Sequence, residues 1–433
     1  MKPVKPDAMN HLTSPRCNLL WLITMAVVSG LLFCPPVRAS EEVIVDGVLH
    51  VKNGSTATEG TQTLNLTEQW RIGGDDDDVF FGVVSRVMAD DAGNVYLLDS
   101  QLSEVQVFSP TGEYLRTLSR EGDGPGEVRN PNDMIFMPDG TLGLVQQFPG
   151  KIIKVDLEGN PAGEFTPGNL DPTAGGFIAL ADAKSGGGNL VLGGVNITVD
   201  TAAGAQNRHC YVASFADDGT EKVRYQELDY RWEFPDVVLS EWEMLFVWRR
   251  WVVDQQGRVL IPPAHNQYAI NVYNPDGTLD RVIEREFTSF KREADNPSVT
   301  QTIMEAIERQ VQRQGVPQAK AQIEDSDPDV GSIHLGEDGS IWVLSSRGNR
   351  NQPPGIMATY DVFDTDGHFQ KEVQVACEGD GVKDGLFFLP NNRVIKVTGF
   401  VDAVLAQLGG GDAELEDTAE EPMPMEVVCY AIQ

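Results

Sequence analysis

The chain has 433 residues, of which 41% are hydrophobic and 23% are charged, and its formal net charge at pH 7 is −32. Such an acidic surface repels phosphate backbones and anionic lipids, so nucleic acid and membrane surfaces are excluded as expected partners. The length exceeds that of one ordinary core but suits a closed array of small sheets. The expected partners are proteins, peptides or small molecules, bound by a monomer.

The first 39 residues have the pattern of a signal peptide. Basic residues precede an apolar run over 19–33, a Pro-Pro pair at 35–36 ends it, and Ala39 follows at a cleavage position. The run is short for a bilayer span, and no later segment is longer, so we expect no membrane insertion after cleavage. A membrane anchor is the alternative. The pattern predicts a periplasmic or secreted protein.

A unit of four short strands and two tight turns recurs along the chain. In residues 85–118 the two turns end at Gly93 and Gly112, and Gly140 and Gly159 repeat both after the same interval. The later copies of these turns occur at 186–189, 216–219, 254–257, 274–277, 336–339, 364–367 and 390–392. A period of this length in an all-β chain is typical of a β-propeller with one four-stranded sheet per blade.

Six copies of the first turn predict six blades, and the sixth blade lacks its outer strand. Residues 66–72 precede blade one in the register of an outer strand, so we expect them to pair with the last strand and close the ring. The predicted fold is all-β: a six-bladed propeller of antiparallel blades with one helical insertion. The predicted organisation is a signal peptide at 1–39, an N-terminal extension at 40–63 and a propeller at 64–433, with the helical insertion at 290–330 and an acidic loop at 409–424.

Two stretches of blades one and two resemble NHL-repeat propellers, and we suspect an exported bacterial member of that family. The first comprises residues 120–127 followed by Asn130-Pro131, and the second comprises residues 93–99 followed by 105–108. The resemblance is fragmentary in blade four and weak elsewhere. It implies a six-bladed propeller without fixing an activity, because the family includes protein-binding modules, nucleic-acid binders and, more distantly, lyases and lactonases.

The long segments of the chain are expected on one face of the propeller. Residues 193–208, 345–357 and 401–424 join second to third strands, and residues 290–330 link blades four and five. We call this side the loop-bearing face and expect binding to occur there, because functional residues concentrate in loops on rigid scaffolds. The opposite side, which carries the tight turns, is the turn face.

The link between blades four and five contains a predicted helix. Ser298 supplies a cap, Ile303, Ile307 and Val311 recur every four residues, and Gly315 ends the pattern. Core packing is the favoured role for its apolar stripe, with a lid over a pocket as the alternative.

The inner strands carry the candidate binding residues. Counting back seven positions from each first turn gives Arg86, Asp133, Ala181, Arg250, Ser332 and Gly385, and Arg249 and Trp251 flank Arg250. Converging arginines in so acidic a chain could hold a carboxylate, sulfate or phosphate. The favoured alternative is that they pair with Asp133 and other carboxylates to join the blades.

Candidates for catalysis are few. The histidines lack metal-ligand spacing, although Asn132, Asp133 and His265 could hold an ion in the channel. The run Asp75–Asp78 offers oxygen ligands for Ca²⁺ but has no calcium-loop pattern, so a solvated acidic loop is favoured and no cofactor is expected. The leading hypothesis is a non-enzymatic exported binding or scaffold module. The alternative is a metal-dependent hydrolase or lyase, similar to a lactonase.

Three cysteines follow the predicted cleavage position: Cys210, Cys377 and Cys429. An oxidising compartment permits one disulfide bond, and Cys377–Cys429 is the expected pair because both lie near the closing blade.

Overall fold

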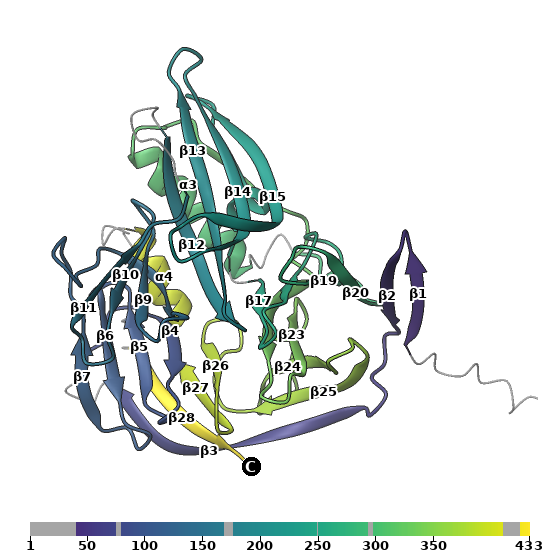
Figure 1. The fold of residues 1–433 in the computed structure, drawn as a ribbon. Coiled ribbons are helices and arrows are strands. Elements are labelled where there is room, and N and C mark those ends of the chain that lie inside the picture. The colour runs from purple at the N-terminus through teal and green to yellow at the C-terminus, as the bar shows by residue number, and fades with distance from the viewer. Residues whose placement is uncertain (1–39, 75–78, 169–175, 249, 293–297, 410–424) are drawn as a thin grey trace, which may run out of the picture. The chain divides into compact units, whose positions relative to one another are not determined.

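The computed structural model describes residues 40–74, 79–168, 176–248, 250–292, 298–409 and 425–433. The described residues belong to one compact unit, Ser40–Gln433. The predicted signal peptide, the Asp75–Asp78 run and most of the acidic loop lie outside the described residues. Most of the regular structure of this unit is β-sheet (Figure 1). No helix among the described residues is long and apolar enough to cross a membrane.

Blades one to three are antiparallel four-stranded sheets whose strands follow chain order. Blade one consists of β4 (Val84–Ala89), β5 (Val95–Asp99), β6 (Glu104–Phe108) and β7 (Tyr114–Leu118). Blade two consists of β8 (Pro131–Phe136), β9 (Leu142–Gln146), β10 (Lys151–Val155) and β11 (Pro161–Phe165). Blade three consists of β12 (Gly176–Gly186), β13 (Asn189–Asp200), β14 (Ala205–Phe215) and β15 (Glu221–Glu233).

Blades four to six continue the pattern. Blade four consists of β17 (Val252–Val253), β18 (Val259–Ile261), β19 (Ala269–Tyr273) and β20 (Leu279–Arg285). Blade five consists of β22 (Val330–Leu335), β23 (Ile341–Ser345), β24 (Ile356–Phe363) and β25 (Phe369–Ala376). Blade six contributes β26 (Gly385–Leu389), β27 (Arg393–Val397) and β28 (Glu426–Ile432). The predicted six-bladed propeller is confirmed.

The N-terminal strands wrap three blades, and one of them closes the ring. The hairpin of β1 (Glu41–Val45) and β2 (Val48–Asn53) extends blade four, because β2 pairs in parallel with β20. Strand β3 (Thr61–Gly73) pairs in parallel with β25 over its first residues and antiparallel with β28 over the rest. Leu66 lies opposite Ile432, and Gly73 lies opposite Glu426. The predicted closure is therefore confirmed, and β3 also joins blades five and six into one sheet.

The closing strand contacts blade one as well. The Trp70 indole N–H donates to the carbonyl of Pro110 at 3.1 Å, and its ring covers Gly112. Gly112 has φ +85°, and a Cβ placed there would lie 2.7 Å from the Trp70 ring. This turn needs glycine for two reasons, its backbone conformation and its close contact with the ring.

We expect Gly112→Ala to destabilise the protein by more than the roughly 1 kcal/mol that a left-handed alanine alone costs. Gly140→Ala is the matched control, since Gly140 has φ +84° and its Cβ would meet no atom within 4 Å. Urea unfolding of both variants isolates the contact with Trp70. Equal losses of stability in the two variants would show that this contact contributes nothing.

The cores lie between neighbouring blades, where the buried faces of adjacent sheets pack together. The seam between blades one and two is tightly filled. Its central side chains are completely buried: Tyr96, Leu98, Met134, Leu142 and Leu144 are each 0% exposed.

Blade three departs from the prediction. Residues 193–208, expected as a long loop, belong to β13 and β14, which run on to a short turn at 201–204 (Figure 1). The outer end of the sheet has its own packing, since the Arg208 guanidinium lies 3.7 Å from the centre of the Trp232 ring. Leu228 and Tyr230 also pack against the helical segment that follows blade three. This packing favours extended strands over a loop.

The predicted helical insertion is present as α3 (Val299–Arg313), and the Ser298 hydroxyl accepts from the backbone N–H of Gln301. Ile307 and Val311 pack in a small core with Val237 and Leu239, as the core-packing interpretation expected. The described residues contain two further helices, α2 (Glu241–Leu245) and α4 (Phe400–Gly409), and α4 contacts α3. A short parallel pair, β16 (Val238–Ser240) with β21 (Lys320–Gln322), joins the insertion to the segment between blades three and four.

The expected disulfide bond is wrong: Cys210, Cys377 and Cys429 are all free and buried. Cys377 packs in the core between blades five and six, whose members include Tyr430. Cys429, the residue before Tyr430 on β28, packs in the separate core that contains Trp70. Because successive side chains of a strand point to opposite faces, Cys429 faces away from Cys377. Proximity in the closing blade therefore did not imply contact.

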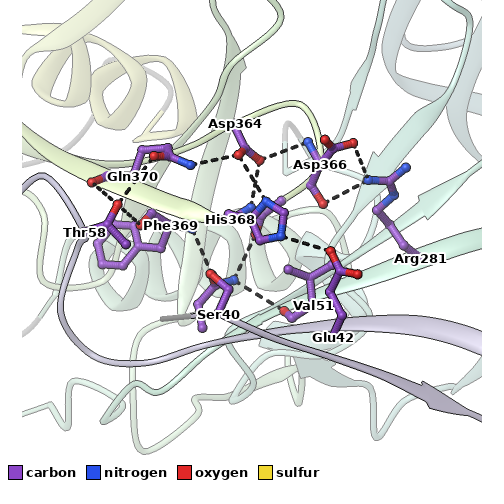
Figure 2. A network of polar contacts seen from close by, with 12 residues as sticks. Ser40, Glu42, Val51, Thr58, Arg281, Asp364, Asp366, His368, Phe369 and Gln370 are labelled. Carbon is purple, nitrogen blue, oxygen red and sulfur yellow. Dashed lines mark hydrogen bonds and ion pairs between the residues drawn. The ribbon is translucent and has the colours of Figure 1, made fainter. Parts of the chain in front are cut away.

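The N-terminal hairpin is fastened to blade five through His368. Figure 2 shows its ring between Glu42 of β1 and Asp364, with each carboxylate 3.1 Å from one ring nitrogen. Nearby, the Asn53 side chain donates to the Gly367 carbonyl at 2.9 Å and accepts from the Phe369 N–H at 2.8 Å. These contacts join the start of the described chain to the second turn of blade five.

We predict that this contact weakens at alkaline pH. Burial opposes the charge on His368, but Asp364 and Glu42 outweigh it and raise the pKa of the imidazole. The imidazole pKa in an unfolded chain is about 6.5, so with a raised pKa in the folded protein the contact stabilises fully below about pH 6.5. This stabilisation is lost as the pH rises through the pKa of the folded state. The melting temperature of His368→Gln should therefore approach that of the wild type between pH 6 and 9. A pH-independent difference would contradict the prediction.

Candidate functional site

The first predicted site residues meet on the inner strands of blades one and two. Arg86 of β4 and Asp133 of β8 form an ion pair with 3.3 Å between Nε and Oδ1. The Asp133 side chain is completely buried, and its other oxygen accepts from the backbone N–H of Ala183 at 3.2 Å. Asp133 therefore links three blades. This is the blade-joining role that the sequence offered as the alternative to ligand binding.

Two charged residues of blade three, Asp182 and Lys184, complete this group. Sequence counting pointed to Ala181, but β12 has the same register shift as β4 and β8, and it places Asp182 level with Arg86 and Asp133. The count failed because the first hairpin of blade three turns at Gly187 and Gly188, a tighter turn than in blades one and two. Counting back seven residues from this turn therefore gives Ala181, one position before Asp182. We call Arg86, Asp133, Asp182 and Lys184 the channel cluster.

The channel cluster is compensated in charge. Lys184 Nζ lies 2.5 Å from Asp182 Oδ2 and 4.5 Å from the centre of the Trp251 ring. Burial lowers the pKa of Lys184, while burial and the neighbouring Asp133 raise the pKa of Asp182. The attraction between the two cations and the two carboxylates therefore offsets only part of the cost of burying Asp182 and Lys184.

His334 of β22, in blade five, is affected electrostatically by the two cations of the channel cluster. Burial, together with the positive charges of Arg86 and Lys184, lowers the pKa of His334 to about 4. Its imidazole is therefore neutral at pH 7 and presents one hydrogen-bond donor and one acceptor.

Two further predicted residues have structural hydrogen bonds. The Asn132 amide donates to the carbonyls of Leu180 and Ala181 at 3.1 and 2.8 Å, which joins blade two to blade three. His265 is buried, and its Nε2–H donates to the Ser326 carbonyl at 2.8 Å. Asn132 and His265 are thus held by backbone carbonyls.

The channel metal site that the sequence offered as an alternative is not assembled in the described part of the chain. No group of three His, Cys, Asp or Glu side chains there could hold a metal ion. The two carboxylates of the channel cluster are each engaged by a cation, Asp133 by Arg86 and Asp182 by Lys184. The other candidate, Asp75–Asp78, lies outside the described residues.

Arg250 lies at the start of the inner strand of blade four, on the loop-bearing face. It is only 8% exposed, and its one hydrogen bond among the described residues is long, 3.4 Å from Nη2 to the Ala264 carbonyl. Nε and Nη1 are buried and have no hydrogen-bond partner among the described residues. Burial lowers the pKa of Arg250 to about 10, opposed by the charge of Glu241. Arg249, the adjacent predicted residue, lies outside the described residues.

One aromatic ring, that of Trp242, lies against this guanidinium. Trp242 of α2 lies beneath it, 5.2 Å from the guanidinium carbon to the ring centre, and the His265 ring meets Trp242 edge-on. The neighbouring Trp251 is completely buried, and its indole N–H donates to the Val247 carbonyl at 3.2 Å. The site therefore consists of one buried cation on an aromatic platform.

The arginines around Arg250 are paired, in contrast. Arg292 forms a bidentate ion pair with the completely buried Glu241, at 2.6 and 2.7 Å. Arg292 also binds Asp327 at 2.7 Å, and Arg350 binds the other oxygen of Asp327. This Glu241–Arg292–Asp327–Arg350 network fixes the helical insertion to the segment that precedes blade four. Sequence reasoning missed it, because its members come from three distant segments with no shared motif.

Six four-stranded sheets closed by an N-terminal strand define this protein as a six-bladed β-propeller. The sequence model of the family DUF5128, described as a 6-bladed beta-propeller, matches residues 75–169. This stretch contains blades one and two, where the repeat is clearest. No curated protein is significantly similar to the chain.

Several solved structures are similar over most of their length. A protein described as exported, from Bacteroides fragilis, has 10% identity and a TM-score of 0.47, with 88% of this chain and 99% of that chain covered. A DUF4221 family member from Bacteroides vulgatus has 10% identity and a TM-score of 0.43, covering 86% and 98%. The calcium-binding protein regucalcin from Agrobacterium tumefaciens has 12% identity and a TM-score of 0.38, covering 85% and 95%. Identities this low carry no inference about function.

Proposed function

We propose that this protein is an exported binding module of the NHL type that holds an anionic group of a peptide, protein or small molecule on its loop-bearing face. The anionic group would be a carboxylate, sulfate or phosphate, and Arg250 would bind it. The observation that supports the proposal is the buried Arg250 guanidinium, which has two nitrogens without hydrogen-bond partners among the described residues. Export rests on the signal-peptide pattern of residues 1–39.

The physical argument concerns the cost of burying a charge. A buried guanidinium is stable only when an anion and hydrogen-bond acceptors replace the water that it loses. Arg292, on the same face, has Glu241 and Asp327 for this purpose. Arg250 has one carbonyl and the Trp242 ring, neither of which neutralises its charge. An oxyanion from a ligand would supply the missing charge and accept from one of the two nitrogens that have no partner among the described residues.

The test compares two arginines with opposite surroundings. Sulfate, phosphate and succinate are titrated against the wild type, Arg250→Met and Arg129→Met, by calorimetry and by the shift in melting temperature. Arg129 is the control, because it lies on the same face but is about half exposed and already paired with Asp123. We expect at least one anion to bind the wild type and Arg129→Met, and its affinity to fall at least tenfold in Arg250→Met.

Arg250→Met should itself fold, since methionine replaces an unneutralised cation with an apolar chain of similar length. Its melting temperature without ligand reports this directly. The proposal fails if none of the three anions binds the wild type, or if Arg250→Met binds them as the wild type does.

A further inference from the structure

A cavity of about 650 Å³ opens on the turn face, away from the loop-bearing face. It lies around the first hairpin of blade five and reaches the neighbouring blades on both sides. Its walls include His334, Trp342 and Phe388, and its rim includes Thr365, Pro390 and Arg393. The volume is within the range of pockets that hold small molecules, roughly 300–1,000 Å³.

The cavity exists because the seam between blades five and six is incompletely filled. The corresponding seam between blades one and two buries its central side chains completely. Between blades five and six, Trp342, Phe388 and Tyr430 are only partly buried, and the inner strand β26 is half-buried over most of its length. Aromatic rings that neighbouring blades do not cover offer an apolar wall for a ligand.

The wall of this seam is aromatic and uncharged. Trp342 and Phe388 have ring centres 5.4 Å apart, and the His334 ring lies 5.6 Å from that of Phe388. His334, neutral at pH 7, adds a hydrogen-bonding edge to this wall. A flat apolar ring is the ligand part that such a wall favours, because its burial removes apolar surface from water on both sides.

The charged groups at the rim are mostly engaged within the protein. Arg258 pairs with Asp254 at 2.6 Å, and Asp338 accepts from the backbone and hydroxyl of Ser340. Glu337 accepts from the N–H of Asn391 at 2.7 Å. Each of these charged groups already has a partner within the protein, so none of them favours a charged ligand.

Arg393 at the rim is also engaged within the protein. Nε and Nη1 donate to the carbonyls of Pro390 and Gly93. Nη2 is buried beside Gly93 of blade one, so it offers no donor to the cavity. The cavity therefore combines an aromatic wall with a rim whose charged groups are engaged within the protein.

We infer that the seam between blades five and six, on the turn face, is a second binding site, which takes a small uncharged aromatic molecule. The ring lies against Trp342 and Phe388. The site is independent of Arg250, which lies on the opposite face, so either site can fail without affecting the other.

The test uses 2-acetylnaphthalene, an uncharged fluorescent aromatic ketone, titrated against the purified full-length protein. We expect saturable binding at one site per chain. Pro390→Trp should block the seam from its exposed rim and weaken binding at least tenfold, because a large side chain there would fill the space beside Phe388. Thr365→Trp fills the other side of the cavity, toward blade four, and should leave the affinity within a factor of three.

Asp91→Trp is the matched control, an exposed residue in the first turn of blade one that does not line the cavity. All three substitutions are at exposed turn residues, so their melting temperatures should match that of the wild type. The inference is overturned if 2-acetylnaphthalene does not saturate, or if Pro390→Trp and Asp91→Trp bind it equally. Loss of binding in Thr365→Trp alone would also overturn it, since the ligand would then lie away from Trp342 and Phe388.

Discussion

Deleting residues 40–73 is expected to abolish cooperative folding. Strand β3 is the outer strand of blade six and also extends blade five, so its loss exposes the edges of both β28 and β25. The deletion also removes Trp70 and Ile72 from the core between blades six and one. A propeller without its closing strand has two open ends, which favour aggregation over a stable ring.

The control is a deletion of residues 40–53, which removes β1 and β2 and keeps β3. That hairpin covers one edge of blade four, so the shorter variant should fold with a lower melting temperature. Circular dichroism and urea unfolding of both variants distinguish the outcomes. A cooperative transition in the longer deletion would mean that ring closure by β3 is dispensable, whatever the shorter deletion does.

The architecture could be predicted from local features of the sequence. Each tight turn carries its signal within four residues, and Gly93, Gly112, Gly140 and Gly159 of blades one and two have φ between +84° and +94°. The closing strand was predictable for a related reason. Residues 66–72 precede blade one in the same register in which the outer strand Tyr114–Leu118 precedes blade two. The repeat period and the turn residues are local features of the sequence, so both can be recognised without any knowledge of packing.

The errors arose where packing decided the outcome. Residues 193–208 became strands because the outer end of blade three has aromatic packing of its own, and Asp182 was missed because one shorter turn shifted the count by one residue. Cys377 and Cys429 are near in the fold but face different cores. Arg86 and Asp133, in contrast, form the ion pair that the favoured interpretation of the sequence described.

The site itself was predictable only in outline. The loop-bearing face and Arg250 were predicted from topology and spacing, but the isolation of Arg250 depends on which carboxylates reach its neighbours. Glu241 lies only nine positions before Arg250 in the chain, and yet it binds Arg292. A sequence shows that acids and bases are present, whereas the pairing among them follows from the tertiary structure.

Glu241→Gln is expected to lower the free energy of unfolding by about 3–5 kcal/mol, the usual cost of breaking a buried ion pair by neutralising one partner. The Glu241 carboxylate is completely buried, holds both terminal nitrogens of Arg292 and accepts from the Glu324 N–H at 3.0 Å. Glutamine has the same shape but no charge, so Arg292 would remain buried with Asp327 as its only carboxylate. Urea unfolding measures the loss.

Glu227→Gln is the matched control, because Glu227 pairs with Arg224 at 3.3 Å but is 61% exposed, and exposed pairs contribute about 1 kcal/mol or less. Equal effects of the two substitutions would show that the Glu241 network is not structural. The double variant Glu241→Gln with Arg292→Met should recover part of the stability, since it removes the stranded cation. That recovery would also show that a buried arginine without an adequate anion is costly on this face, which is the condition in which Arg250 already lies.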